Sequence, residues 1–379
     1  MREFVIDWSD AEVQAVLDRV AAARIPEVPV SGWGAGCDPA FLEKFRQHWV
    51  NGYDWRAAMA DLNRFPQFIA NVDGLDIHFV HIKGEGSAAR PLVMTHGWPG
   101  SIYEFWACAE ELAFPSRFGG SAEDAFDLVM PTLPGYGYSG KPAAPLGPRA
   151  TAGLWNKLMT EVLGYSSYLA QGGDWGSLVT SFLGADHADD VRGIHLNMLP
   201  FRRFTAPDDE ESRQWSAGLE AASFLYGGYS HLQMTKPNAL AMMAAESPLG
   251  QAAWILERFH DWGDLGEREV DEVFGMDHLI TNVMLYVMPD SFISALYYYH
   301  GLMLEGMSSL AQTKVLAPLA YAAFPGDALM APPPRHFVEQ TYNVARWTPM
   351  PKGGHFAAME QPRLFIDDVR AWGRDAWTA

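Results

Sequence analysis

Cysteine is almost absent from this sequence. Only Cys37 and Cys108 occur among the 379 residues, and they lie far apart in the chain. Two distant thiols build neither a disulfide framework nor a thiolate cluster for a metal. We therefore expect a protein of a reducing compartment, most simply the cytoplasm.

Basic residues and long apolar runs are also scarce. The 27 Lys and Arg residues are outnumbered by 46 Asp and Glu residues, which gives a formal net charge of −19 and argues against a nucleic-acid partner. The start, "MREFVIDWSD", is charged from its second residue and lacks the apolar core of a signal peptide, and no apolar run reaches membrane-spanning length. We expect a soluble protein without a membrane anchor.

The rest of the composition is that of a globular protein, with 49% hydrophobic and 19% charged residues. Residues 1–85 are predicted to form an N-terminal extension. Within it, "DWSDAEVQAVLDRVAAARIP" predicts one helix, and "DPAFLEKFRQHWVNGYDWRAAMADLNRFPQF" predicts two more, separated at Gly52 and ended by Pro66. "GLDIHFVHIKG" then alternates as a strand does.

Residues 86–200 alternate short apolar strands with helices. The strands are predicted in "PLVMTHGWPGS", "FDLVMPTLPGYGYSG", "SSYLAQGGDWGS" and "VRGIHLNMLP". Residues 201–300 have helical periodicity and no clear strand, and residues 301–379 resume the sheet and close with a helix. We expect an α/β fold with a mostly parallel sheet, in which the helical insertion is a lid over the carboxyl ends of the strands.

Two motifs that suggest a cofactor or a metal do not fit their chemistry. "GYGYSGK", residues 135–141, approaches a P-loop, but Pro142 stands where that loop needs Ser or Thr, and no helix opens after it for a dinucleotide. A tight glycine turn is the better interpretation. His78 and His81 lie three apart on a predicted strand and so face opposite sides. We expect no cofactor and no metal.

The stretch "QGGDWGS", residues 171–177, has the outline of a nucleophile elbow between a strand and a helix. Asp174 stands where such elbows usually carry serine. The alternative is that Asp174 caps the following helix, a position that favours Asp.

Two further motifs favour the elbow. A turn in "HGWPGS", residues 96–101, would aim the Trp98 N–H at Asp174, and the Trp175 N–H directly follows it, so the two form a candidate oxyanion hole. His355, in "KGGHFAAME", follows the last strand and is a candidate base, with a structural turn histidine as the alternative. The order of nucleophile, acid and histidine is that of α/β-hydrolases.

The acid that orients His355 is expected just past a strand. Asp327, in "FPGDALM", is our choice, Glu339 is the alternative, and a plain turn residue remains a third interpretation of Asp327.

A carboxylate nucleophile restricts the reaction. Attack on an alkyl carbon leaves an ester that water can cleave, whereas attack on an ester carbonyl would need an anhydride. Asp174 therefore indicates displacement at saturated carbon, with an epoxide or a haloalkane as substrate, and His355 would activate the water of the second step. An opened epoxide needs a proton donor for its alkoxide, which a tyrosine supplies.

The chain resembles epoxide hydrolases of the α/β-hydrolase fold, of the microsomal and juvenile-hormone type. The resemblance spans nearly the whole length, through "YDWRAAMADLNRFPQF", "HGWPGSIYEFW", "LPGYGYSGKP", "GGDWGS", "GYSHLQMTKP", "TNVMLY" and "GGHFAAME". It implies Asp174 as nucleophile, His355 as base and Asp327 as acid, where microsomal relatives often carry Glu. It also implies an apolar epoxide as substrate and no cofactor, while a homodimer is left open.

For the proton donors the resemblance implies Tyr229, in "GGYSHLQ", and Tyr299, the last tyrosine of "YYY". Tyr297 and Tyr298 compete with Tyr299, because a slip of one residue turns a helical side chain by about 100°. The nearest rival function is a haloalkane or haloacid dehalogenase with the same nucleophile. Trp98 stands where haloalkane dehalogenases use a halide-binding Asn. A non-catalytic relative is a third reading, against which Asp174 and His355 argue.

Overall fold

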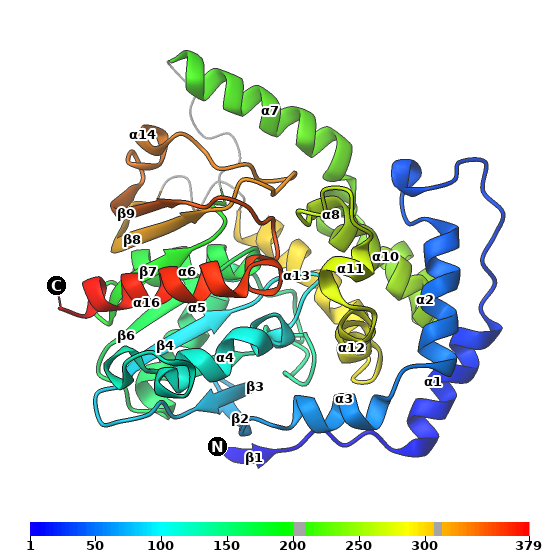
Figure 1. The fold of residues 1–379 in the computed structure, drawn as a ribbon, viewed down its shortest axis with the longest axis horizontal. Coiled ribbons are helices and arrows are strands. Elements are labelled where there is room, and N and C mark those ends of the chain that lie inside the picture. The colour runs from blue at the N-terminus through cyan, green and yellow to red at the C-terminus, as the bar shows by residue number, and fades with distance from the viewer. Residues whose placement is uncertain (201–208, 307–312, 379) are drawn as a thin grey trace.

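The computed structural model describes residues 1–200, 209–306 and 313–378, which are built around one twisted sheet (Figure 1). The described strands follow the order β1-β2-β3-β5-β4-β6-β7-β8-β9 across the sheet. Their bounds are β1 Arg2–Phe4, β2 Gln67–Val72, β3 Leu75–Ile82, β4 Arg90–Thr95, β5 Phe126–Pro131, β6 Tyr168–Gly172, β7 Val191–Leu196, β8 Val315–Ala323 and β9 Tyr342–Pro349.

The sheet is parallel where the sequence alternates strand and helix. Strands β5, β4, β6, β7, β8 and β9 pair in parallel, whereas β1, β2 and β3 of the N-terminal extension pair antiparallel and join the sheet through β3 and β5. Every residue of β4, β5 and β6 is buried, as expected for strands covered by helices on both faces. The predicted fold class is confirmed by this topology.

Helices cover both faces of the sheet. Helices α4 (Trp106–Ala113) and α16 (Pro362–Thr378) pack together on one face, with the short α15 (Ala357–Glu360) beside them. Helices α5 (Pro148–Lys157) and α6 (Trp175–Asp186) pack together on the other, and α5 continues as a π-helical turn at Leu158–Val162. A short helix, α14 (Arg335–Val338), precedes β9.

Seven helices lie between β7 and β8 in the described part of the chain. They are α7 Glu210–Tyr226, α8 Gly228–Thr235, α9 Pro237–Ala245, α10 Pro248–Trp262, α11 Val270–Phe274, α12 Met276–Val287 and α13 Phe292–Glu305. Figure 1 shows α8 and α10 to α13 gathered beside one end of the sheet, while α7 reaches outward. The N-terminal helices α1 and α2 contact α10 and α12 on their far side.

The extension agrees with its predicted helices. They are α1 (Asp10–Ala22), α2 (Pro39–Asn51) and α3 (Trp55–Leu62), and α2 ends next to Gly52 as expected. Ser9 and Glu12 form a capping box at the start of α1, which satisfies free N–H groups of the first turn. Strands β1 and β2 were not foreseen. β1 has three residues and pairs with β2, more than sixty residues away, whereas β2 forms a hairpin with β3 in which Val72 pairs with Leu75.

Among the described helices, none is long and apolar enough by itself to cross a membrane, and only α12 and α13 taken together, bent by 79°, meet that test of length and composition.

Candidate active site

Asp174 occupies a strained turn between β6 and α6. Its backbone has φ 48° and ψ −124°, a region that non-glycine residues rarely adopt and that costs free energy. The carboxylate makes no capping hydrogen bond to α6. The helix-cap interpretation therefore does not explain this aspartate, whereas a nucleophile elbow requires such a turn.

Two glycines allow the elbow to lie close to the end of strand β4, which pairs with β6 in the sheet. A Cβ atom at Gly97 would overlap the Asp174 carboxylate, and one at Gly176 would overlap the carbonyl oxygen of Thr95. Gly97, in the loop after β4, and Gly176, in α6, thus let that loop and the elbow lie close together.

The two carboxylate oxygens of Asp174 have different surroundings. Oδ1 accepts a hydrogen bond from the Trp98 N–H at 2.7 Å. Oδ2 lies 3.3 Å from Nε2 of His355. The Trp175 N–H stands at the first residue of α6, next to Asp174 in the chain. One oxygen therefore faces the Trp98 N–H and the other faces the imidazole.

His355 and Asp327 form a buried pair. Nδ1 of His355 lies 2.8 Å from Oδ2 of Asp327, and Oδ1 of Asp327 accepts the N–H groups of Leu329 and Met330 at 3.0 and 2.9 Å. The backbone N–H of His355 donates to the backbone carbonyl of Trp262 at 3.0 Å. Both members of the pair are thereby fixed by the backbone around them.

The pKa of His355 results from opposing effects. Burial lowers it, but the charge of Asp327, together with hydrogen bonds and charge from Asp174 and Asp327, raises it well above the ordinary value. A neighbouring anion favours the imidazolium. The two neighbouring carboxylates therefore favour the protonated form of His355.

Glu339, the alternative acid, lies elsewhere. Its carboxylate pairs with Nε of Arg335 at 2.8 Å on the surface, so Asp327 is the carboxylate beside His355. A different glutamate, Glu360, supports the histidine turn by accepting the N–H groups of Gly354 and Phe356 at 2.8 and 2.9 Å.

Tyr229 and Tyr299 are brought together from α8 and α13. Their rings lie 5.7 Å apart. Tyr229 stacks on Trp98 at 5.1 Å, and Tyr299 meets Trp175 edge-on at 4.4 Å. Both tyrosines are buried and rest on the two tryptophans that flank the elbow. Burial raises the pKa of Tyr299 well above its ordinary value, so the phenol keeps its proton at neutral pH.

The other two tyrosines of "YYY" point their hydroxyls elsewhere. Tyr297 donates to Asn238 Oδ1 at 2.8 Å, and Tyr298 donates to Thr151 Oγ1 at 2.9 Å. The hydroxyls of Tyr297 and Tyr298 thus bond to residues outside the site, whereas the Tyr299 ring lies beside that of Tyr229.

Two residues next to the site, Trp262 and Glu104, were not predicted from the sequence to belong to it. The buried Trp262 ring of α10 lies 4.9 Å from His355 and 5.1 Å from Tyr229. Glu104, within the quoted "HGWPGSIYEFW", lines a small cavity together with Asp174 and His355. A carboxylate in an otherwise apolar stretch was the available signal for Glu104, whereas nothing in the sequence marked Trp262.

Both the N-terminal part of the chain and its sheet are similar to known proteins. Residues 1–105 match the family model for the epoxide hydrolase N terminus, and residues 90–222 match that for the alpha/beta hydrolase fold. Epoxide hydrolase 1 of Sus scrofa is 33% identical over 98% of this chain and 88% of its own length. Juvenile hormone epoxide hydrolase 1 of Ctenocephalides felis is 35% identical over 86% of this chain and 75% of its own.

The chain belongs to the epoxide hydrolase family. Solved structures of epoxide hydrolases are similar over the full length. Juvenile hormone epoxide hydrolase of the silkworm Bombyx mori matches with a TM-score of 0.89 and 26% identity, covering 100% of this chain and 95% of its own. The Aspergillus niger epoxide hydrolase gives 0.86 and 27%, covering 99% and 96%. The resemblance inferred from the motifs is thus confirmed.

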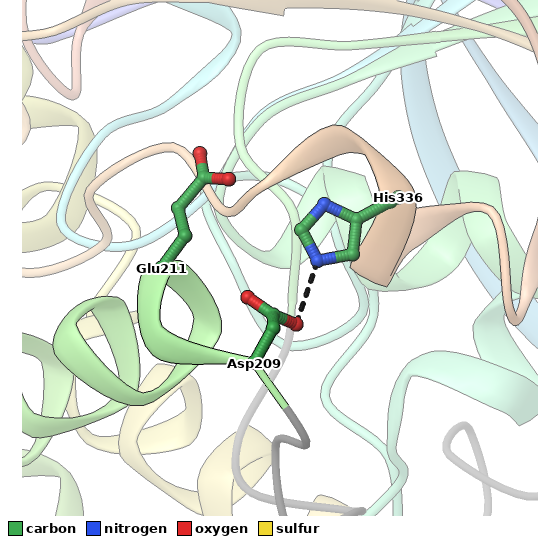
Figure 2. A group of neighbouring side chains, drawn as sticks. All are labelled: Asp209, Glu211 and His336. Atoms are coloured by element: carbon green, nitrogen blue, oxygen red, sulfur yellow. Dashed lines mark hydrogen bonds and ion pairs between the residues drawn. The ribbon is translucent and has the colours of Figure 1, made fainter.

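A second group of polar side chains lies outside the epoxide hydrolase site. Asp209, Glu211 and His336 have ligand atoms within 4.8 Å of one another (Figure 2). Both oxygens of Asp209 are already used, because Oδ1 accepts the Ser212 N–H at 2.8 Å and Oδ2 accepts from the Ser212 hydroxyl and His336 at 2.8 and 2.9 Å. This is a helix cap on α7 that also contacts α14, and we assign no metal to it.

Proposed function

We propose that this epoxide hydrolase forms vicinal diols in two steps, through a covalent ester of Asp174. The observation that carries the proposal is the pair of environments around the Asp174 carboxylate. One oxygen is held by a backbone donor and the other lies beside a histidine that is backed by an acid.

In the first step, Oδ2 of Asp174 attacks an epoxide carbon. The C–O bond of the ring breaks, and its electron pair goes to the epoxide oxygen. Oδ1, already bonded to the Trp98 N–H at 2.7 Å, becomes the carbonyl oxygen of the ester. The nucleophile needs no base, because a carboxylate is charged at neutral pH.

The leaving oxygen takes a proton from Tyr229 or Tyr299. Both rings lie over the tryptophans that flank the nucleophile, and a phenol is acidic enough to protonate an alkoxide. The partners of the Tyr297 and Tyr298 hydroxyls favour Tyr299 over its two neighbours. A departing halide would need no such donor, so the tyrosine pair also favours epoxides over haloalkanes.

In the second step, His355 takes a proton from water, and the hydroxide adds to Cγ of the ester. The N–H groups of Trp98 and Trp175 hold the resulting oxyanion. The Cγ–Oδ2 bond then breaks, the imidazolium returns its proton to the leaving diol oxygen, and the Asp174 carboxyl is restored.

Ester formation itself prepares His355 for this role. The Asp174 charge and hydrogen bond help to raise the pKa of His355, and the ester carries no charge. The pKa of His355 therefore falls when the ester forms, so the imidazolium gives its proton, through solvent, to the tyrosinate left by ring opening and the neutral imidazole can act as a base.

The substrate we propose is an apolar epoxide, because the rings of Tyr229, Tyr299 and Trp262 pack around the Trp98 ring, whose backbone N–H holds the carboxylate. We further propose that the helices between β7 and β8 work as a lid that carries the tyrosines. A panel of aryl and alkyl epoxides tested beside bromoalkanes, with assays for diol and bromide, checks the assignment. Diol from the epoxides supports it, and bromide release without diol would overturn it.

A further inference from the structure

A small cavity lies beside Asp174. Its polar side chains are Glu104, Asp174, Asn197 and His355, and neither Tyr229 nor Tyr299 lines it. It has room for about one water molecule. The nucleophile therefore borders a cavity that neither candidate proton donor lines.

The second step of the proposed reaction needs a water on this side. Nε2 of His355 is buried without a well-aligned hydrogen-bond partner, although it lies 3.3 Å from Asp174 Oδ2. A water beside it donates one proton to Nε2. Its second proton needs an acceptor, so that an oxygen lone pair points at Cγ of the ester.

Glu104 is the side chain in the cavity that can accept that second hydrogen bond. Two other side chains in the cavity carry acceptor oxygens. Oδ1 of Asn197 already accepts from Gln171 Nε2 at 2.9 Å, and the Asp174 carboxyl is the group that the water attacks. Glu104 and His355 therefore both border the cavity beside the reacting carboxyl.

The Glu104 carboxyl is held firmly in place. It follows the turn "HGWPGS" in the short 3-10 helix Ile102–Phe105, and the N–H groups of Gly97 and Ser101 hydrogen-bond to it. A Cβ atom at Gly100 would overlap its Oε1. The same turn thus carries the Trp98 donor and anchors a carboxyl in the cavity.

The charge of Glu104 is coupled to that of Asp174. Burial, and then the charge of Asp174, raises the pKa of Glu104 to about 8, while His355 and the two N–H groups act in the opposite direction. Formation of the ester removes the Asp174 charge, the second of these causes, whereas burial remains. A carboxyl oxygen accepts a hydrogen bond in either protonation state.

We propose that Glu104 is a positioning residue for the water that cleaves the ester. Its carboxyl oxygen accepts one O–H of the water while His355 takes the other proton, and the water oxygen bonds to Cγ. The second proton remains on the restored Asp174 carboxyl and then passes to His355, which restores the imidazolium and the ionised carboxylate. This inference rests on the proposed function, since it assigns a role within the ester-cleaving step.

Glu104→Gln separates this role from support of the turn. The amide oxygen still accepts from Gly97 and Ser101, so the amide NH₂, a donor only, is left facing the cavity. Glu104→Leu removes both roles. Glu110→Gln is the matched control, because Glu110 lies nearby on α4 and pairs with Arg117 on the surface.

Rapid-quench single turnovers read by intact-protein mass give the rates of ester formation and ester breakdown separately. We expect Glu104→Gln to slow breakdown by about tenfold or more, to leave formation within about threefold, and to accumulate ester in steady state. Glu110→Gln should change neither rate. We expect Glu104→Leu to lower both rates.

An equal loss in both half-reactions of Glu104→Gln, or an unchanged breakdown rate, would overturn the role of Glu104 alone. If no ester formed in the wild-type protein while diol accumulated, the proposed function itself would fail. The two failures are therefore distinguishable in one experiment.

Discussion

The two sides of the site are built differently. On one side, Asp174, Asp327 and His355 follow the ends of β6, β8 and β9, and backbone hydrogen bonds fix each of them. On the other side, Tyr229 and Tyr299 come from helices α8 and α13 and rest on the tryptophans through ring contacts. Directional hydrogen bonds at strand ends hold atoms more tightly than ring packing does.

This difference indicates a division of labour. The strand-end side makes and breaks the covalent bonds to carbon, which demand fixed geometry. The helical side supplies a proton, which tolerates some movement and suits a surface that must admit substrate. Variants on the two sides should therefore affect different steps.

The largest effect is expected on the strand-end side. Asp174→Ala removes the nucleophile, so diol formation should fall below about 10⁻⁴ of the wild-type rate. Asp186→Ala is the control, because Asp186 lies at the far end of α6 and pairs with Arg149 at 2.7 Å. Residual turnover of a few per cent in Asp174→Ala would show that the ester is not required.

His355→Gln should stop the reaction halfway. The ester still forms, but no base activates water, so its breakdown should slow by about 10³-fold or more. Intact-protein and peptide mass spectrometry should find substrate attached to Asp174. A variant that turned over without any adduct would remove His355 from the second step.

The helical side should respond in the opposite step. Tyr229→Phe combined with Tyr299→Phe should slow ester formation by about 10²-fold or more, because the alkoxide loses its proton donors, and should leave ester breakdown nearly unchanged. Tyr297→Phe and Tyr298→Phe are matched controls, since their hydroxyls bond to Asn238 and Thr151. An unchanged rate of ring opening in the double variant would contradict the assignment of proton donation to the helical side.

The smallest expected effect concerns the cap that links α7 to α14. Hydrogen bonds to Ser212 and His336 lower the pKa of Asp209, and Asp209 raises the pKa of His336. The contribution of Asp209 is lost as the pH falls, and that of His336 is lost as the pH rises, so the pair stabilises between about pH 4 and about pH 7. Asp209→Asn should lower the melting temperature slightly at pH 6 and less at pH 9. Equal shifts at both values would exclude the ion pair.

The strand-end side was the more predictable one. Its residues stand in short motifs where glycines and a preceding apolar strand define the turn, so Asp174, Asp327 and His355 could be chosen from local pattern. The choice among three consecutive tyrosines could not be made this way. It depends on how α13 is rotated, and packing against other helices sets that rotation.

Residues that reach the site from other parts of the fold could not be predicted from sequence patterns either. Trp262 reaches the site because the last turn of α10 places its ring against those of Tyr229 and His355, and the sequence of α10 contains no sign of that contact. Glu104 lies inside a quoted motif, but its cavity exists only once β4, β6 and the histidine turn are assembled. Local sequence determines turns, whereas the shape of a cavity depends on the whole fold.

A single turnover in ¹⁸O-labelled water, with enzyme in excess over epoxide, tests the covalent ester most directly. Because water attacks Cγ and the diol leaves with an oxygen of the enzyme, the label should appear in the carboxyl group of Asp174 and be absent from the diol. Label in the diol and none in Asp174 would mean that water attacks the epoxide itself, which contradicts the account.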